Sequence, residues 1–340
     1  MLTSTVRWLL GQVPLPVYRL VLQRRVLGLY YHVVSNEPLP HVRHLYPYKT
    51  PRMFEDDLLY LAHGYSLITY EHLAAHYRRA QRLAPRSAIL TFDDGLAECY
   101  SEVRPLLLRH GVPCVFFVTT DYIDNRRMGY DHKASLCIES LGSLEGGALS
   151  NAVASVGGVF DKELSSGIEL MAWVKSIAVS QPSTIDRLCR ELRMDVDGYL
   201  AFRHPYLTSD EIRRLAADGF TIGAHSVSHR RLGSLTEQEV EEEIAGSCRM
   251  IAELTGQPQV PFAFPFSADG IPRELLRTIR SRHEHVGMFF GTAELRRDRG
   301  EIVNRICGDW PDGSDTRTSN LPRRLARAYV EELALRVRGA

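Results

Sequence analysis

Short apolar runs alternate with amphipathic stretches along most of the chain. Fully apolar runs bounded by turn residues are typical of strands that are covered on both faces. We therefore expect strands at residues 26–31, 66–69, 88–92, 112–118, 220–224, 262–266 and 286–290. Because helical stretches follow most of these runs, the pattern predicts an α/β protein with a parallel sheet. About seven strands favour a distorted or incomplete (β/α)7 barrel, with an open doubly wound sheet as the alternative.

Helix signals divide the chain into one barrel-like domain, 1–340, with three additions. Thr208-x-x-Glu211 and Thr236-x-x-Glu239 are capping boxes that predict two helix starts. Residues 128–206 lack a strand repeat, and we interpret them as an inserted helical cap. We expect an N-terminal helical extension at 1–25 and a C-terminal helix at 319–340.

Composition narrows the class of protein. With 44% hydrophobic and 24% charged residues, the chain resembles an ordinary globular protein. Its formal net charge of zero gives no electrostatic reason to expect a nucleic-acid partner. The six cysteines form no C-x-x-C pair, so we do not expect a sulfur-ligated zinc site. Cys99, Cys114 and Cys248 fall within predicted regular elements, which predicts buried free thiols. No apolar stretch is long enough to span a bilayer, and the first 22 residues lack a cleavage site, so we expect a cytoplasmic protein. An amphipathic N-terminal segment in peripheral contact with a membrane is the alternative.

Two polar clusters directly follow predicted strands. Asp93 and Asp94 end one apolar run, and His225 and His229 follow another. Two imidazoles and one carboxylate can bind a divalent ion and leave positions open for water and substrate. The second carboxylate is then free to act as a base. Because the carboxyl ends of parallel strands meet at one rim of a barrel, residues far apart in the sequence can assemble there.

Four motifs occur at the ends of predicted strands: Tyr31-His32, Thr91-Phe92-Asp93-Asp94-Gly95, His225-Ser226-Val227-Ser228-His229 and Phe262-Ala263-Phe264-Pro265-Phe266. Together they resemble the polysaccharide deacetylases, the NodB-homology group known as carbohydrate esterase family four. The resemblance implies a (β/α) barrel with seven repeats and metal-dependent removal of acetyl groups, usually from N-acetylated sugars.

The same resemblance assigns roles to individual residues. It implies that Asp94, His225 and His229 bind the metal and that Asp93 is the base that activates the attacking water. The backbone N–H of Phe266 would help to hold the tetrahedral oxyanion. Zinc is the expected metal for this ligand set, although cobalt, nickel and iron accept similar ligands.

The chain departs from the usual family pattern at its general acid. Many members carry a Leu-x-His motif near the C-terminus, but no histidine follows His285 here. In exopolysaccharide-processing relatives the acid histidine lies at the end of the first strand, and His32 matches that position. We therefore predict His32 as the acid; a histidine packed under the rim is the alternative. His132, which opens the cap, could line the substrate cleft.

A second departure concerns the residue that orients the base. Ala263 stands where many members have an arginine, and Arg305 could replace it from a different strand. Asp309-Trp310 resembles part of the fourth motif, in which the aspartate would partner that arginine. Trp310 could also wall the pocket around the acetyl methyl group.

The sequence predicts an N-deacetylase that acts on an N-acetylated carbohydrate, in a glycan or a glycan precursor of exopolysaccharide type. An O-acetyl esterase or another amidohydrolase on the same scaffold is one alternative, and a non-catalytic glycan-binding protein is another. A spare carboxylate beside a set of metal ligands argues against the binding protein, which has no need of a base.

Overall fold

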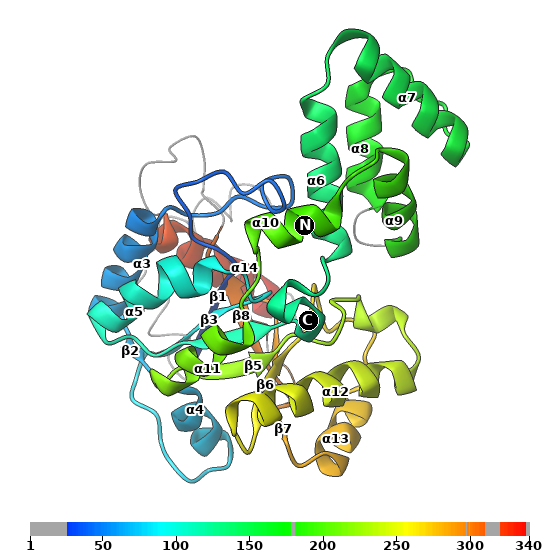
Figure 1. The fold of residues 1–340 in the computed structure, drawn as a ribbon. Helices are drawn as coiled ribbons and strands as arrows, with labels where there is room; N and C mark the ends of the chain where they lie inside the picture. The colour runs from blue at the N-terminus through cyan, green and yellow to red at the C-terminus, as the bar shows by residue number, and fades with distance from the viewer. Residues whose placement is uncertain (1–25, 178–180, 297, 299, 310–319, 338–340) are drawn as a thin grey trace.

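Seven parallel strands form a closed barrel in the computed structural model, which describes residues 26–177, 181–296, 298, 300–309 and 320–337 (Figure 1). The strands are β1 (Leu27–Tyr31), β3 (Ser87–Phe92), β4 (Val115–Val118), β5 (Thr221–Ala224), β6 (Val260–Ala263), β7 (Val286–Gly291) and β8 (Ile302–Cys307). They follow one another in chain order, and β1 closes the ring by pairing with both β3 and β8. This closure excludes the open doubly wound sheet.

The barrel differs from the sequence expectation in one strand. The expected strand near residue 66 is the two-residue β2 (Ser66–Leu67), which pairs with the start of β3 outside the ring. The seventh ring member is β8, which the apolar pattern did not predict. Its Asn304 and Arg305 interrupt the apolar run, and Arg305 points into the barrel.

Side chains alternate between the barrel interior and the surrounding helices, as parallel strands require. One cluster fills the interior and contains Ile89, Val115, Phe117, Ala263, Phe290 and Val303. The intervening positions, such as Leu90, Phe116 and Ile222, pack in a larger cluster with the helices. Both faces of each strand are therefore apolar, which explains why the strands read as continuous hydrophobic runs.

Helices cover the barrel on its outside. They are α3 (Pro51–Gly64), α4 (Tyr70–Tyr77), α5 (Arg104–His110), α11 (Ser209–Ala217), α12 (Glu237–Thr255), α13 (Arg273–Arg282) and α14 (Leu321–Val337), with short turns at Cys99–Val103, Thr120–Asn125 and Leu232–Ser234. The capping boxes predicted at Thr208 and Thr236 are both present. Among the described residues, no helix has the length and apolar character needed to cross a bilayer.

Five helices leave the barrel between β4 and β5 and project beyond its rim (Figure 1). They are α6 (Tyr130–Gly142), α7 (Gly146–Phe160), α8 (Gly167–Ile177), α9 (Pro182–Glu191) and α10 (Val196–Arg203). Four of them, α6 to α9, share an apolar cluster of their own, around Leu141, Val156 and Leu188. We call α6–α10 the cap. The predicted extension at residues 1–25 lies outside the described residues.

Candidate active site

The chemically important residues lie where barrel strands end. His32 follows β1, Asp93 and Asp94 follow β3, and His225 follows β5. Four residues at this rim have positive φ angles: Asp94 (72°), Ser226 (65°), His229 (58°) and Phe266 (60°). Such angles are uncommon outside glycine and persist only where the surrounding structure enforces them, often at functional sites. The rim therefore holds its side chains in directions that ordinary strand and turn geometry would not give.

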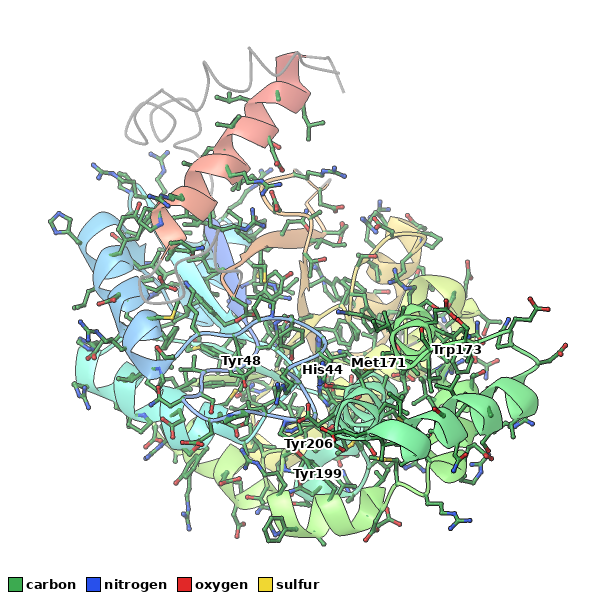
Figure 2. All side chains as sticks on the ribbon, turned by 90° about the horizontal axis from the view of Figure 1, so that it is seen from above. His44, Tyr48, Met171, Trp173, Tyr199 and Tyr206 are labelled. Atoms are coloured by element: carbon green, nitrogen blue, oxygen red, sulfur yellow. The ribbon has the colours of Figure 1, made fainter. Side chains whose placement is uncertain are left out.

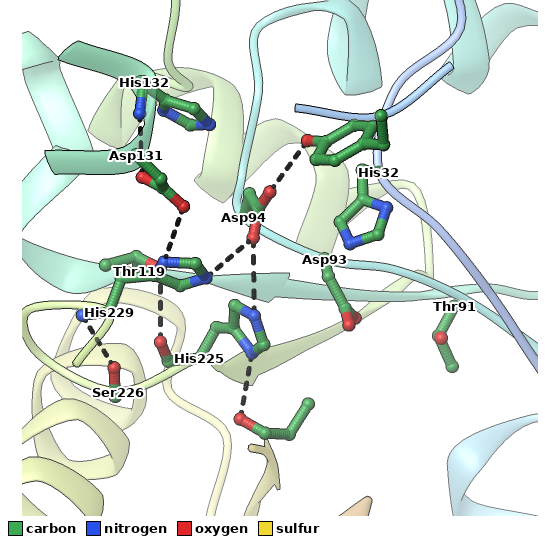
Figure 3. A network of polar contacts seen from close by, with 12 residues as sticks. His32, Thr91, Asp93, Asp94, Thr119, Asp131, His132, His225, Ser226 and His229 are labelled. Carbon is green, nitrogen blue, oxygen red and sulfur yellow. Dashed lines mark hydrogen bonds and ion pairs between the residues drawn. The ribbon is translucent and has the colours of Figure 1, made fainter. Parts of the chain in front are cut away.

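Asp94, His225 and His229 form one buried cluster (Figure 3). Nε2 of His225 lies 3.4 Å, and Nε2 of His229 lies 3.2 Å, from Oδ1 of Asp94. One ligand atom from each residue lies within 4.8 Å of the other two. The fold therefore brings together the three side chains that the sequence offered as metal ligands.

Charge and hydrogen bonding at this cluster fit a divalent ion. Nδ1 of His225 lies 2.9 Å from the carbonyl oxygen of Ala263, which can only accept, so Nδ1 carries a proton and Nε2 is the atom directed at Asp94. Oδ1 of Asp94 is buried between the two imidazoles; burial raises the pKa of Asp94, but hydrogen bonds from the imidazoles hold it well below its usual range. Burial lowers the pKa of His229, but Asp131 and Asp94 raise it to about 10. The two carboxylates therefore stabilise a positive charge at the position of the His229 ring. A divalent ion among the three residues would be bound by both Nε2 atoms and by the Asp94 carboxylate.

Asp93 is held by Arg305 of β8. The guanidinium donates two hydrogen bonds to the carboxylate, from Nη1 to Oδ1 at 2.6 Å and from Nη2 to Oδ2 at 2.8 Å. Nη1 also lies 2.8 Å from Oγ1 of Thr91. A bidentate arginine fixes both the plane and the direction of a carboxylate. Arg305 thus orients Asp93 from β8, whereas Ala263 on β6 has no side chain that could do so.

The Arg305 side chain is fully buried inside the barrel. Its guanidinium carbon lies 4.9 Å from the ring centroid of Tyr30 and 5.1 Å from that of Phe117, within the range of cation–π attraction. A Cβ at Gly28 would lie 2.8 Å from Cγ of Arg305 and 2.8 Å from the carbonyl oxygen of Asn304. The glycine on β1 therefore leaves the space through which the arginine reaches Asp93.

His32 is paired with Asp309, which is fully buried. Nδ1 of His32 lies 2.5 Å from Oδ2 of Asp309, and the backbone N–H of His32 donates to Oδ1 at 3.3 Å. Burial lowers the pKa of His32, but the charge of Asp309 and its hydrogen bond raise it to about 9. The expectation that Asp309 partners the arginine is therefore wrong, because the aspartate binds the histidine and Arg305 binds Asp93. Trp310 lies outside the described residues.

Tyr46 links the two halves of the site. Its hydroxyl donates to Oδ2 of Asp94 at 3.1 Å, and its ring stacks on that of His32 with centroids 4.4 Å apart. Tyr46 lies on the long loop between β1 and α3, which crosses the rim beside the cap near His44 and Tyr48 (Figure 2). Nothing in the apolar pattern marks this loop residue, so sequence analysis missed it.

Phe266 follows β6 and combines a positive φ with a position beside the cluster. Its ring centroid lies 5.0 Å from that of His229, and its carbonyl oxygen accepts a hydrogen bond from Thr292 at 2.6 Å. Among the described residues, the backbone N–H of Phe266 has no hydrogen-bond acceptor.

A cavity of about 430 Å³ opens over these residues. Barrel and cap both contribute to it, and its lining is Tyr30, His32, His44, Leu45, Tyr46, Asp93, Asp94, Asp131, Lys175, His225, His229, Phe264, Phe266, Thr292 and Cys307. His132 does not line this cavity, because its buried ring packs behind Asp131 against Tyr206. The cap residues in the lining are instead Asp131, which lies 3.3 Å from His229, and Lys175 of α8.

Comparison with known proteins identifies the class. A sequence model of the family "Polysaccharide deacetylase" matches residues 80–283, which is more than half of the chain. The chain therefore belongs to the polysaccharide deacetylase family and is a hydrolase that deacetylates polysaccharides. A comparison with curated protein sequences found no match.

Solved structures of low sequence identity share the fold. The deacetylase PplD of Streptococcus pyogenes, solved in complex with acetate, is 14% identical, with a TM-score of 0.56 over 90% of this chain and 99% of that chain. A polysaccharide deacetylase of Bacillus cereus, BC0361, is also 14% identical, with a TM-score of 0.52 over 90% and 69%. IcaB from Ammonifex degensii is 17% identical, with a TM-score of 0.50 over 90% and 97%. These likenesses support the seven-stranded barrel that the sequence predicts.

Proposed function

We propose that this protein is a metal-dependent N-deacetylase that acts on N-acetyl sugar residues of a glycan or glycan precursor. Asp94, His225 and His229 would hold one divalent ion, for which zinc is the best match to two imidazoles and one carboxylate. When bound, the ion polarises the acetyl carbonyl and stabilises negative charge on its oxygen. The observation that carries the proposal is the convergence of two histidine Nε2 atoms on Oδ1 of Asp94 beneath the cavity.

The remaining residues supply the two proton transfers of amide hydrolysis. Asp93 takes a proton from the water that attacks the acetyl carbon, and Arg305 aims its carboxylate and balances its charge. As the carbon–nitrogen bond breaks, His32 gives its proton to the sugar nitrogen, so that acetate and a free amine leave. The backbone N–H of Phe266 donates to the oxyanion of the tetrahedral intermediate.

The pairing of His32 with Asp309 supports hydrolysis of bonds whose leaving group must be protonated. An amine is a poor leaving group unless it is protonated, whereas the oxygen of an activated aryl ester leaves without help. The Asp309 carboxylate keeps the pKa of His32 near 9, which supplies a protonated acid at neutral pH. A sugar alkoxide also benefits from a proton, so the acetate-release comparison below separates N-acetyl from O-acetyl substrates.

Metal analysis and acetate release together test the proposal. Purified protein should contain about one zinc per chain, and His225→Gln should lose it. His72→Gln on the exposed surface of α4 is the matched control and should keep it. Acetate should be released from N-acetylglucosamine oligomers faster than from acetylated xylan. Faster release from the xylan would instead indicate an O-acetyl esterase, and no release from either would favour a binding protein.

A further inference from the structure

The cap contributes one buried carboxylate to the site. Asp131 lies in the first turn of α6, is 6% exposed, and lines the cavity. Its Oδ2 lies 3.3 Å from Nδ1 of His229, on the side of the ring away from Asp94 (Figure 3). This is an ion-pair contact rather than a short hydrogen bond.

The backbone around Asp131 fixes this carboxylate. Oδ1 accepts a hydrogen bond from the backbone N–H of His132 at 2.9 Å, which leaves Oδ2 for His229. A Cβ at Gly129 would come within 2.6 Å of Oδ1 and 2.3 Å of the hydroxyl oxygen of Tyr122. Since both neighbours are buried, only glycine at 129 allows the carboxylate to sit where it does.

Both points at which the chain passes between barrel and cap are attached to the rim near Asp94. On the outgoing side, the hydroxyl of Tyr206 lies 3.3 Å from the N–H of Gly129 and 2.5 Å from Nδ1 of His132. On the returning side, Leu207 N–H donates to the carbonyl oxygen of Gly95 at 2.9 Å. The start of α6 is therefore held in a fixed place relative to the candidate metal ligands.

The position of Asp131 excludes two other roles. It approaches Nδ1 of His229, whereas Nε2 of the same ring faces Asp94, so Asp131 is not in the group of three candidate ligands. A role as a helix cap alone would use Oδ1 and would not require Oδ2 to face an imidazole. A carboxylate on the far nitrogen of a metal-bound histidine fixes its tautomer and orientation and makes the ligating nitrogen more basic.

We propose that Asp131 is a positioning residue for His229, so that the cap is part of the metal site as well as a wall of the cavity. The inference rests on the proposed metal site. Its consequence is that metal affinity depends on a residue of the inserted cap. A change that displaces the start of α6 weakens metal binding without touching any ligand.

Zinc affinity of the metal-free protein, measured by competition with a chromophoric chelator at fixed pH, tests this inference. Asp131→Ala should raise the zinc dissociation constant about 100-fold, within the range typical for lost partners of metal ligands. Asp131→Asn should raise it only about 10-fold, because an amide oxygen of the same shape still faces Nδ1 although the negative charge is lost. Gly129→Ala keeps the carboxylate but displaces it, and should also weaken binding.

Glu139→Gln is the matched control. Glu139 lies on the same helix and docks the cap onto the neighbouring loop through His44, 2.7 Å away, without contact to a candidate ligand. Its zinc dissociation constant should equal that of the wild type, and thermal unfolding of each metal-free variant shows whether it is folded. Wild-type affinity in Asp131→Ala would overturn the inference, as would equal weakening in Glu139→Gln. Failure of the wild type to bind zinc would overturn the metal site itself, and this inference with it.

Discussion

Replacement of Asp309 by asparagine should slow amide hydrolysis about 30-fold at pH 8 and preserve hydrolysis of activated esters. The aspartate is fully buried and its Oδ2 lies 2.5 Å from Nδ1 of His32. Asparagine has nearly the same shape, so the barrel rim keeps its packing while the negative charge is lost. The variant therefore tests the electrostatic role of Asp309 rather than its volume.

The size of the effect follows from the pKa of His32. Burial lowers this pKa, and Asp309 is the leading cause that raises it to about 9. Asp94 and Asp93 also raise it but contribute less. Without the Asp309 charge, the pKa falls toward the ordinary histidine value of ~6.5. At that value the protonated fraction at pH 8 drops from about 90% to about 3%, which predicts a loss of about 30-fold on amides.

Two substrates and a pH series measure this effect. Acetate release from N-acetylglucosamine oligomers reports the amide reaction, and 4-nitrophenyl acetate reports attack on an ester whose leaving group needs no proton. Wild-type kcat/KM on the amide should fall as pH rises through about 9, because the protonated form of His32 is lost there. In Asp309→Asn the same fall should move down toward about pH 6.5.

Asp218→Asn, an exposed aspartate paired with Arg104, controls for loss of one carboxylate. It should behave like the wild type on both substrates. Equal losses on the amide and the ester in Asp309→Asn would refute the reasoning, because leaving-group protonation would then not be the step affected. An unchanged pH limit on the amide would move the acid role to another residue.

Three further predictions concern the base and its support. Asp93→Asn should retain zinc, measured by metal analysis, and lose about 100- to 10,000-fold in acetate release, because the base is gone while the candidate ligands remain; near-normal turnover would exclude Asp93 as the base. Arg305→Met should leave the buried Asp93 without its counter-charge and lower the free energy of unfolding by about 3–5 kcal/mol in urea denaturation; unchanged stability would show that water or another cation replaces the guanidinium. Gly28→Ala should place a methyl group against Arg305 and the backbone of Asn304, cost about 1–3 kcal/mol of stability in the same assay, and slow turnover; a fully active and stable variant would contradict the close approach at this strand.

The sequence predicted most of the barrel because parallel strands covered on both faces leave a local signature. The runs that end at Phe92, Val118 and Ala224 are strands as expected. The exception is β8, where Arg305 interrupts the apolar pattern. That arginine points into the barrel to hold Asp93, so the residue that hid the strand is a candidate functional one.

The sequence alone determined the residue types of the site and their positions at strand ends. Which side chains pair is set by the closure of the barrel, because β8 lies beside β1 in space although the two strands stand at opposite ends of the chain. Because β8 and β1 are neighbours, Asp309 pairs with His32 and Arg305 reaches Asp93. The attachment of the cap places Asp131 beside His229. The local pattern of apolar and polar residues shows which face of a helix or strand is buried. A hydrogen bond between residues distant in sequence depends on backbone directions, and these are set only when the strands pair.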